Sequence, residues 1–123
     1  LMKADLNILK LDTAIEDTFR LINRPLAGFT LHHLLRNLSL FRKRLIIQSL
    51  FVRGIVEGMY VDNTSEIEIN AWLEEVKKLA PELVMIYSIE RATAAGTLEK
   101  VSLPELQEIA HKVSLVGLQA EVY

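Results

Sequence analysis

Four short apolar segments at regular intervals, with amphipathic segments between them, limit the possible folds of this chain more than any other feature. They are LNILKLD (6–12), LIIQSLFV (45–52), ELVMIYSI (82–89) and LQAEVY (118–123), and their starts lie roughly 35 to 40 residues apart. This interval fits one strand, one crossover helix and two loops. The sequence therefore predicts strands that alternate with helices.

The segments between these strands carry helix start signals. The expected N-caps are Thr13, Thr30, Asn63 and Ser102. A glutamate follows three residues after the first, third and fourth of these, which is the spacing of a capping box. Gly117 follows the last helical segment at the position of a C-cap glycine. The predicted order is β-α-α-β-α-β-α-β.

This order predicts an α/β fold with parallel strands, because strands that are separated by helices and share one sheet run the same way. The segments 45–52 and 82–89 are nearly all apolar, as is typical of parallel strands buried on both faces. Four such units make a partial (βα) barrel, half of a TIM-like barrel, or a small open sheet. A complete barrel takes about 250 residues. We expect residues 1–123 to form a single domain.

Composition narrows the functional classes. The net charge of −2 gives no basic field for nucleic acid. No apolar run reaches the 18 or so residues that cross a bilayer, and the N-terminus lacks the layout of a secretory signal, so we expect a cytoplasmic protein. Cysteine is absent, which excludes an iron–sulfur cluster held by thiolates of this chain alone. The start at Leu1, almost inside a strand, suggests a fragment of a longer protein.

Lys10 and Asp12 are the first candidate site residues. They lie two apart at the end of the first strand, so their side chains share one face. Ligands of parallel α/β folds bind at the carboxyl ends of the strands, and this pair could orient a polar ligand there. Alternatively, Asp12 caps the following helix and the Lys10 side chain extends into solvent. The residues alone leave both interpretations open.

Gln48, Arg53 and Tyr87 are the other candidates. Gln48 lies within the second strand, and Ser49 and Arg53 share the opposite face, but the pattern does not say which face looks inward. A buried glutamine needs hydrogen-bond partners, so Gln48 is either a ligand contact or a core amide. Tyr87 could stack on a flat ring or be a core aromatic.

Other features predict no chemistry. We expect residues 53–66, RGIVEGMYVDNTSE, to form a long loop, in which Asn63 is more simply an N-cap than a ligand contact. The three histidines have no metal-ligand spacing and are expected to be structural or on the surface. No catalytic triad or phosphate-binding glycine motif is present. We therefore assign no catalytic and no metal-binding residues.

Several stretches together resemble the second half of a radical S-adenosylmethionine (radical SAM) enzyme. They are LNILKLDTAIEDTFRLINRP, LIIQSLFVRG, NTSEIEINAWLEEVKKLAPELVMIYSIER and ATAAGTLEKVSLPELQEIA. The resemblance covers nearly the whole chain. It is to the branch that includes glycyl-radical-activating enzymes and related Fe–S oxidoreductases.

This resemblance implies a partial (βα)₆ barrel in which a CxxxCxxC loop holds a [4Fe-4S] cluster. S-adenosylmethionine binds that cluster and is cleaved to a 5′-deoxyadenosyl radical. Lys10 and Asp12 would lie near the methionine and ribose of the cofactor, Gln48 and Arg53 on the next strand and its exit, and Tyr87 against adenine. The cysteine loop and the first three strands of the family have no counterpart here. We therefore expect an inactive fragment that holds neither cofactor alone.

Two other interpretations stay open. The first is a non-catalytic α/β module that acts through partner binding or as a homo-oligomer, because a half-barrel leaves a strand edge and an apolar face uncovered. The second, weaker interpretation is an open-sheet domain similar to response-regulator receivers, with Asp12 and Asp62 as a reduced acidic cluster.

Overall fold

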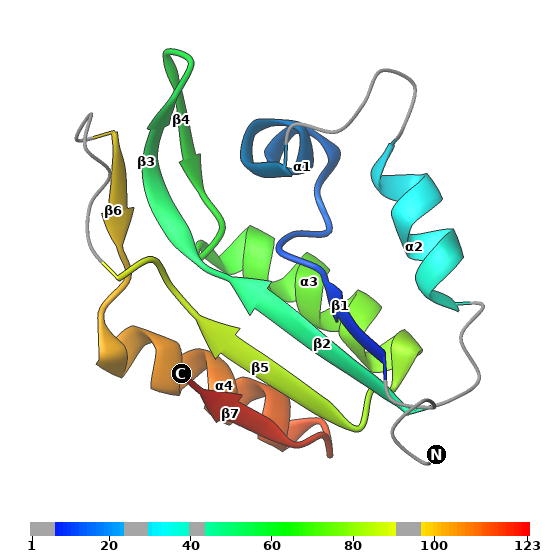
Figure 1. The fold of residues 1–123 in the computed structure, drawn as a ribbon. Coiled ribbons are helices and arrows are strands. Elements are labelled where there is room, and N and C mark those ends of the chain that lie inside the picture. The colour runs from blue at the N-terminus through cyan, green and yellow to red at the C-terminus, as the bar shows by residue number, and fades with distance from the viewer. Residues whose placement is uncertain (1–6, 24–29, 40–43, 91–96) are drawn as a thin grey trace.

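The fold contains the parallel sheet that the sequence predicts. The structure, a computed structural model, describes residues 7–23, 30–39, 44–90 and 97–123. The strands β1 (Asn7–Lys10), β2 (Leu45–Leu50), β5 (Leu83–Tyr87) and β7 (Ala120–Val122) form a four-stranded sheet in the order β1-β2-β5-β7. All three pairings are parallel (Figure 1). The four strands lie within the four predicted segments.

Four helices accompany this sheet. They are α1 (Glu16–Asn23), α2 (Leu31–Ser39), α3 (Glu66–Leu79) and α4 (Leu103–Leu115). In Figure 1, α3 and α4 lie behind the sheet, and α1 and α2 lie on the side of β1. No helix within the described ranges is long and apolar enough to cross a membrane.

The two faces of the sheet differ in their surroundings. On one face Ile47, Val84 and Ile86 are fully buried in a core that α3 and α4 complete. Ser49 lies on the same face, where its hydroxyl accepts a hydrogen bond from Trp72 Nε1 at 3.0 Å. Because side chains alternate along a strand, Gln48 points the opposite way. Figure 1 shows no described helix in front of that opposite face, so we call it the open face.

A second sheet was not predicted. β3 (Val52–Val56), β4 (Met59–Asp62) and β6 (Leu98–Lys100) form an antiparallel sheet in the order β4-β3-β6. The expected long loop over 53–66 is therefore wrong, since most of it is the β3-β4 hairpin. Its turn residues Glu57 and Gly58 have φ angles of 51° and 78°. Two positive φ angles are the requirement of a two-residue type I′ turn.

Two of the four helix starts differ from expectation. α3 is capped by Ser65 rather than Asn63, since the Ser65 hydroxyl accepts the Glu68 N–H. The capping box at Thr13 also does not form, since α1 begins only at Glu16 and the Thr13 hydroxyl accepts the backbone N–H of Ile15. The Glu16 carboxylate instead accepts the backbone N–H of Leu31 at 2.8 Å.

The other predicted helix ends are confirmed. The Thr30 hydroxyl accepts the backbone N–H of His33 at the start of α2. Ser102 and Glu105 form the full capping box of α4. Gly117 follows the C-cap residue of α4 with a φ of 87°, and Leu118 N–H donates to the carbonyl of Val113. These features make a Schellman motif, in which glycine avoids the strain of the left-handed conformation.

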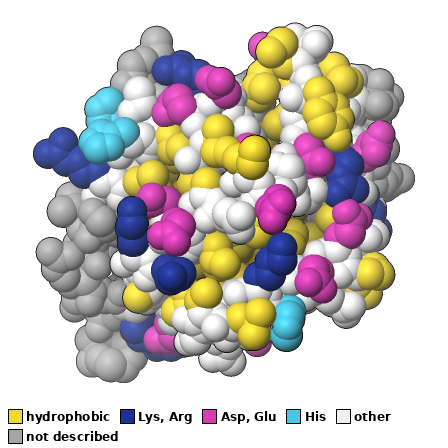
Figure 2. Space-filling model, turned by 180° about the vertical axis from the view of Figure 1, so that it is seen from behind, with side chains coloured by type: hydrophobic (Ala, Val, Ile, Leu, Met, Phe, Trp, Pro, Cys, Tyr) yellow, Lys and Arg dark blue, Asp and Glu magenta, His cyan; other side chains and the backbone are white. Residues whose placement is uncertain are grey.

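The back of the molecule, seen in Figure 2, carries interspersed acidic and basic side chains. A group of hydrophobic side chains lies at the upper right, over the hairpin. The exposed hydrophobic residues of the hairpin are Ile55, Met59 and Tyr60.

Candidate functional site

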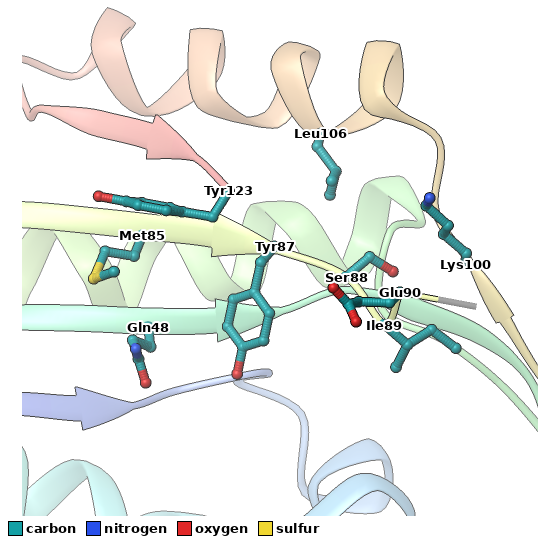
Figure 3. Close-up of a pocket in the computed structure, with 9 residues that line it drawn as sticks. All are labelled: Gln48, Met85, Tyr87, Ser88, Ile89, Glu90, Lys100, Leu106 and Tyr123. Atoms are coloured by element: carbon teal, nitrogen blue, oxygen red, sulfur yellow. The ribbon is translucent and has the colours of Figure 1, made fainter. Parts of the chain in front are cut away.

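The larger of two described pockets opens at the carboxyl ends of β2 and β5. It has a volume of about 650 Å³. Figure 3 shows the residues that line it: Gln48, Met85, Tyr87, Ser88, Ile89, Glu90, Lys100, Leu106 and Tyr123. This volume lies within the range of about 300–1,000 Å³ that is typical of small-molecule sites. The pocket lies where ligands of parallel α/β folds bind.

Strand register brings the side chains of the pocket together on the open face. Gln48 pairs with Met85, and Leu50 pairs with Tyr87, so these side chains point to the same side of the sheet. In Figure 3 the ring of Tyr87 extends from the end of β5 toward β1, and the ring of Tyr123 lies beside Met85. The pocket therefore presents two aromatic rings and a thioether beside one amide.

The Gln48 side chain is half-buried at this pocket. Its amide makes no hydrogen bond to any residue that the structure describes. An amide carries both donors and an acceptor, so Gln48 can bond to a polar partner in the pocket that it lines.

Lys10 lies next to the pocket on the same face. It pairs in register with Gln48, and its Nζ is 6.0 Å from the centre of the Tyr87 ring. The same Nζ is 3.6 Å from Asp12 Oδ2. Burial lowers the pKa of Lys10, but the Asp12 carboxylate and the Tyr87 hydroxyl outweigh this and raise its pKa above the usual value. Lys10 therefore keeps a positive charge at the edge of the pocket.

Asp12 holds the neighbouring strand end and helix in position through its buried carboxylate. Its side chain is fully buried, and Oδ1 accepts the backbone N–H of Leu50 at 2.8 Å. Oδ2 accepts from the Asn23 amide at 3.0 Å. Asp12 thus joins the end of β1 to the end of β2 and to α1. Its carboxylate also attracts the Lys10 ammonium group.

Asn63 is a supporting residue whose role the sequence did not reveal. It is 1% exposed, and its Oδ1 accepts the backbone N–H of Val52 at 2.9 Å. Its Nδ2 donates to the carbonyls of Asp12 at 2.8 Å and Leu50 at 2.7 Å. One buried amide therefore holds together the exits of β1 and β2 and the start of β3. This role could be predicted only if the β3-β4 hairpin were known, because the hairpin brings Asn63 back to the start of β3.

Arg53 lies apart from the other predicted site residues. It is on β3, and its guanidinium contacts Glu105 at 2.5 Å and the Thr64 hydroxyl at 2.7 Å, with Asp62 at 3.6 Å. It lines neither described pocket. The structure thus brings Lys10, Asp12, Gln48 and Tyr87 together and places Arg53 in an ion pair between the hairpin and α4.

Sequence reasoning did not select Met85 and Tyr123. Both follow from the alternation along β5 and β7 once the open face is known, but the sequence did not identify that face. For metals, the described residues contain no group of three or more His, Asp or Glu side chains that could hold an ion.

Two solved structures share this fold. A radical SAM methyltransferase from Sphaerobacter thermophilus superposes with a TM-score of 0.64 at 15% identity, covering 94% of this chain. A domain of pyruvate-formate lyase-activating enzyme from Bacteroides vulgatus superposes with a TM-score of 0.70 at 16% identity, covering 99% of this chain. The chain spans 33% of the length of the first structure and 70% of the second.

At these identities the likeness establishes the fold and nothing finer. No family model and no curated protein matches the sequence. The parallel sheet with helices on one face is therefore an arrangement that occurs in radical SAM proteins.

Proposed function

We propose that this chain is the C-terminal part of a radical SAM barrel, from an Fe–S oxidoreductase of the branch that contains glycyl-radical-activating enzymes. Its open sheet face would contribute part of the S-adenosylmethionine and substrate site. One observation carries the proposal: a fold shared with two radical SAM proteins has a pocket at the carboxyl ends of its parallel strands, lined by aromatic rings and the Gln48 amide.

The pocket residues fit the chemistry of S-adenosylmethionine. The Tyr87 ring offers a flat surface for adenine, and the Gln48 amide can both donate to and accept from polar atoms of the nucleoside. The Lys10 ammonium is suited to the cofactor's carboxylate, and Asp12 positions it. In the proposed enzyme the bound cofactor would supply a 5′-deoxyadenosyl group for radical chemistry. We leave Arg53 out of this set because Glu105, Asp62 and Thr64 occupy its guanidinium.

The iron–sulfur cluster does not fit these residues. The 123 residues contain no cysteine, and the described residues offer no cluster of three alternative ligands. Any cluster would need ligands from outside this sequence, so we expect the chain to have no radical activity by itself.

This proposal departs in one respect from the expectation that the chain holds no cofactor alone, because the nucleoside contacts lie within the pocket and need no cluster. Isothermal titration with S-adenosylhomocysteine, a stable cofactor analogue, tests the nucleoside site. We expect Tyr87→Ala to weaken binding by roughly tenfold to a hundredfold, because stacking of a base on an aromatic ring contributes about 1–3 kcal/mol. Tyr60→Ala is the matched control, since Tyr60 is an exposed tyrosine on the hairpin outside both pockets. Absence of binding, or equal affinity in the Tyr87 variant, would overturn the proposal.

A second candidate function is self-association of a non-catalytic module. β1 and β7 are the edges of the parallel sheet, and Ile8 on β1 is 50% exposed. Unpaired strand edges with exposed apolar side chains favour pairing with another chain.

A further inference from the structure

The second described pocket lies between α1 and the antiparallel sheet. Its volume is about 270 Å³. The residues that line it are Leu21, Ile22, Leu50, Val52, Ile55, Val56, Glu57, Thr97 and Leu98. Seven of these nine are aliphatic, and none is a lysine or arginine. Apart from Glu57, the lining carries no charge, and it disfavours an anionic ligand because desolvation of that charge would not be compensated.

This pocket is adjacent to the first one along β2. Gln48 lines the first pocket and Leu50 lines the second. The two residues are two apart on one strand, so their side chains point to the same face, and their Cα atoms are roughly 6.6 Å apart. A ligand in the second pocket would therefore lie next to a ligand in the first.

Hydrogen bonding and close packing of the backbone fix the walls of the second pocket without a ligand. Asp12 Oδ1 holds the backbone N–H of Leu50, which fixes one wall. Gly54 allows β6 to approach β3 so closely that an added Cβ would lie 2.0 Å from the Thr97 carbonyl oxygen. This approach places Leu98 opposite Gly54 in register, where it forms another wall. A preformed pocket reduces the ordering that a ligand must cause on binding.

We propose that this second pocket binds the apolar part of a small-molecule substrate, either one aromatic ring or a branched alkyl group, next to the nucleoside pocket. The size agrees, since a buried cavity of roughly 150 Å³ accommodates benzene. That the ligand is a substrate rests on the proposed function. That the pocket takes an apolar group rests on its lining residues and its volume.

Methyl NMR of the whole chain with toluene as the probe tests this inference. We expect toluene to shift the methyl signals of Leu50, Val56 and Leu98 in a saturable manner. Val56→Asp should abolish these shifts, and Val56→Thr, which keeps the side-chain shape, should weaken binding several-fold. Ile67→Asp is the matched control, because Ile67 is 75% exposed on α3 and lines neither pocket.

The outcomes separate this inference from the proposed function. Toluene shifts at these methyls without any S-adenosylhomocysteine shift at Met85 would refute the nucleoside site and leave the apolar site standing. An S-adenosylhomocysteine shift at Met85 without toluene shifts at these methyls would refute the apolar site alone. Toluene shifts that persist unchanged in the folded Val56→Thr and Val56→Asp variants would also overturn it. If Val56→Asp does not fold, Val56→Thr decides.

Discussion

At the scale of single residues, buried polar groups at the strand exits hold the site in place. The sequence predicts Lys10, Asp12, Gln48 and Tyr87 as candidates on or just after the parallel strands, and the structure places these four residues near one another. The sequence could not place Asn63, because an asparagine before a helix has the same local pattern whether it caps the helix or bonds distant strands. That choice depends on tertiary partners far away in sequence.

We predict that Asn63→Ala destabilises the protein by roughly 3 kcal/mol. The substitution removes three hydrogen bonds and leaves the Val52 N–H and two carbonyls without the amide, in a buried position where each unpaired group costs about 1–3 kcal/mol. Urea denaturation followed by circular dichroism measures the change in unfolding free energy.

Asn70→Ala serves as the control for this prediction. Asn70 is exposed on α3, where alanine is the better helix former, so the unfolding free energy should stay equal or rise slightly. Equal stability of both variants would mean that the Asn63 amide does not hold the strand exits together.

At the scale of elements, the hairpin and β6 are the parts that the sequence did not predict. Glu57-Gly58 between two apolar stretches, Ile55-Val56 and Met59-Tyr60-Val61, is a hairpin signal, but the same residues also fit the long loop that the sequence predicts. β6 gave no signal, because three residues are too short for a period to be recognised. Its position depends on a close approach of two backbones, which only Gly54 permits.

Two glycine-to-alanine substitutions in the hairpin should differ strongly in their effect on stability. Gly54→Ala would place a Cβ against the Thr97 carbonyl, so we expect a loss of at least about 3 kcal/mol or separation of β6 from β3. Gly58→Ala meets no atom within 4 Å and should cost only about 1 kcal/mol through its positive φ.

Hydrogen exchange of the β3 and β6 amides, together with denaturation, measures this difference. Comparable losses in the two alanine variants would contradict the role of Gly54 in the strand approach.

The ion pair between β3 and α4 should give a pH-dependent stability. Hydrogen bonds from Arg53, with help from Ser102, lower the pKa of Glu105 from 4.5 to about 2. The contribution of ionised Glu105 to the free energy of unfolding is therefore complete above pH 4.5. It is lost as the pH falls from 4.5 toward 2. Because Glu105 is partly exposed, we expect only about 0.5–1 kcal/mol.

Glu105→Gln tests this pH dependence, because glutamine can keep the capping contact to Ser102. The variant should be less stable than the parent at pH 6 and equally stable near pH 2. A difference that stays constant between pH 6 and pH 2 would rule out the ion pair as its source.

At the scale of the whole molecule, the predicted parallel sheet is confirmed, whereas the half-barrel stays a prediction. Four apolar segments at helix-sized intervals leave few arrangements besides parallel strands, and the sheet β1-β2-β5-β7 agrees. Which face is covered depends on the hydrophobic faces of α3 and α4 together. The sequence of β2 alone could not supply this, since both faces of that strand carry apolar residues.

Self-association belongs to this scale as well. If the open face and the β1 edge pair with a second copy, sedimentation coefficients should rise with protein concentration. Ile8→Glu should then shift the protein toward the monomer, whereas Ile67→Glu on α3 should not. A single concentration-independent monomer in the unmodified protein would contradict the association.

β2 and β3 are separated by Phe51 alone, so one extended stretch of main chain belongs to both sheets. Gln48 and Leu50 lie on one side of this junction, and Val52 and Val56 lie on the other. A rotation at Phe51 would therefore change the spacing of both pockets in a single movement. Evolutionary change in the lining of one pocket would thus be mechanically constrained by the geometry of the other.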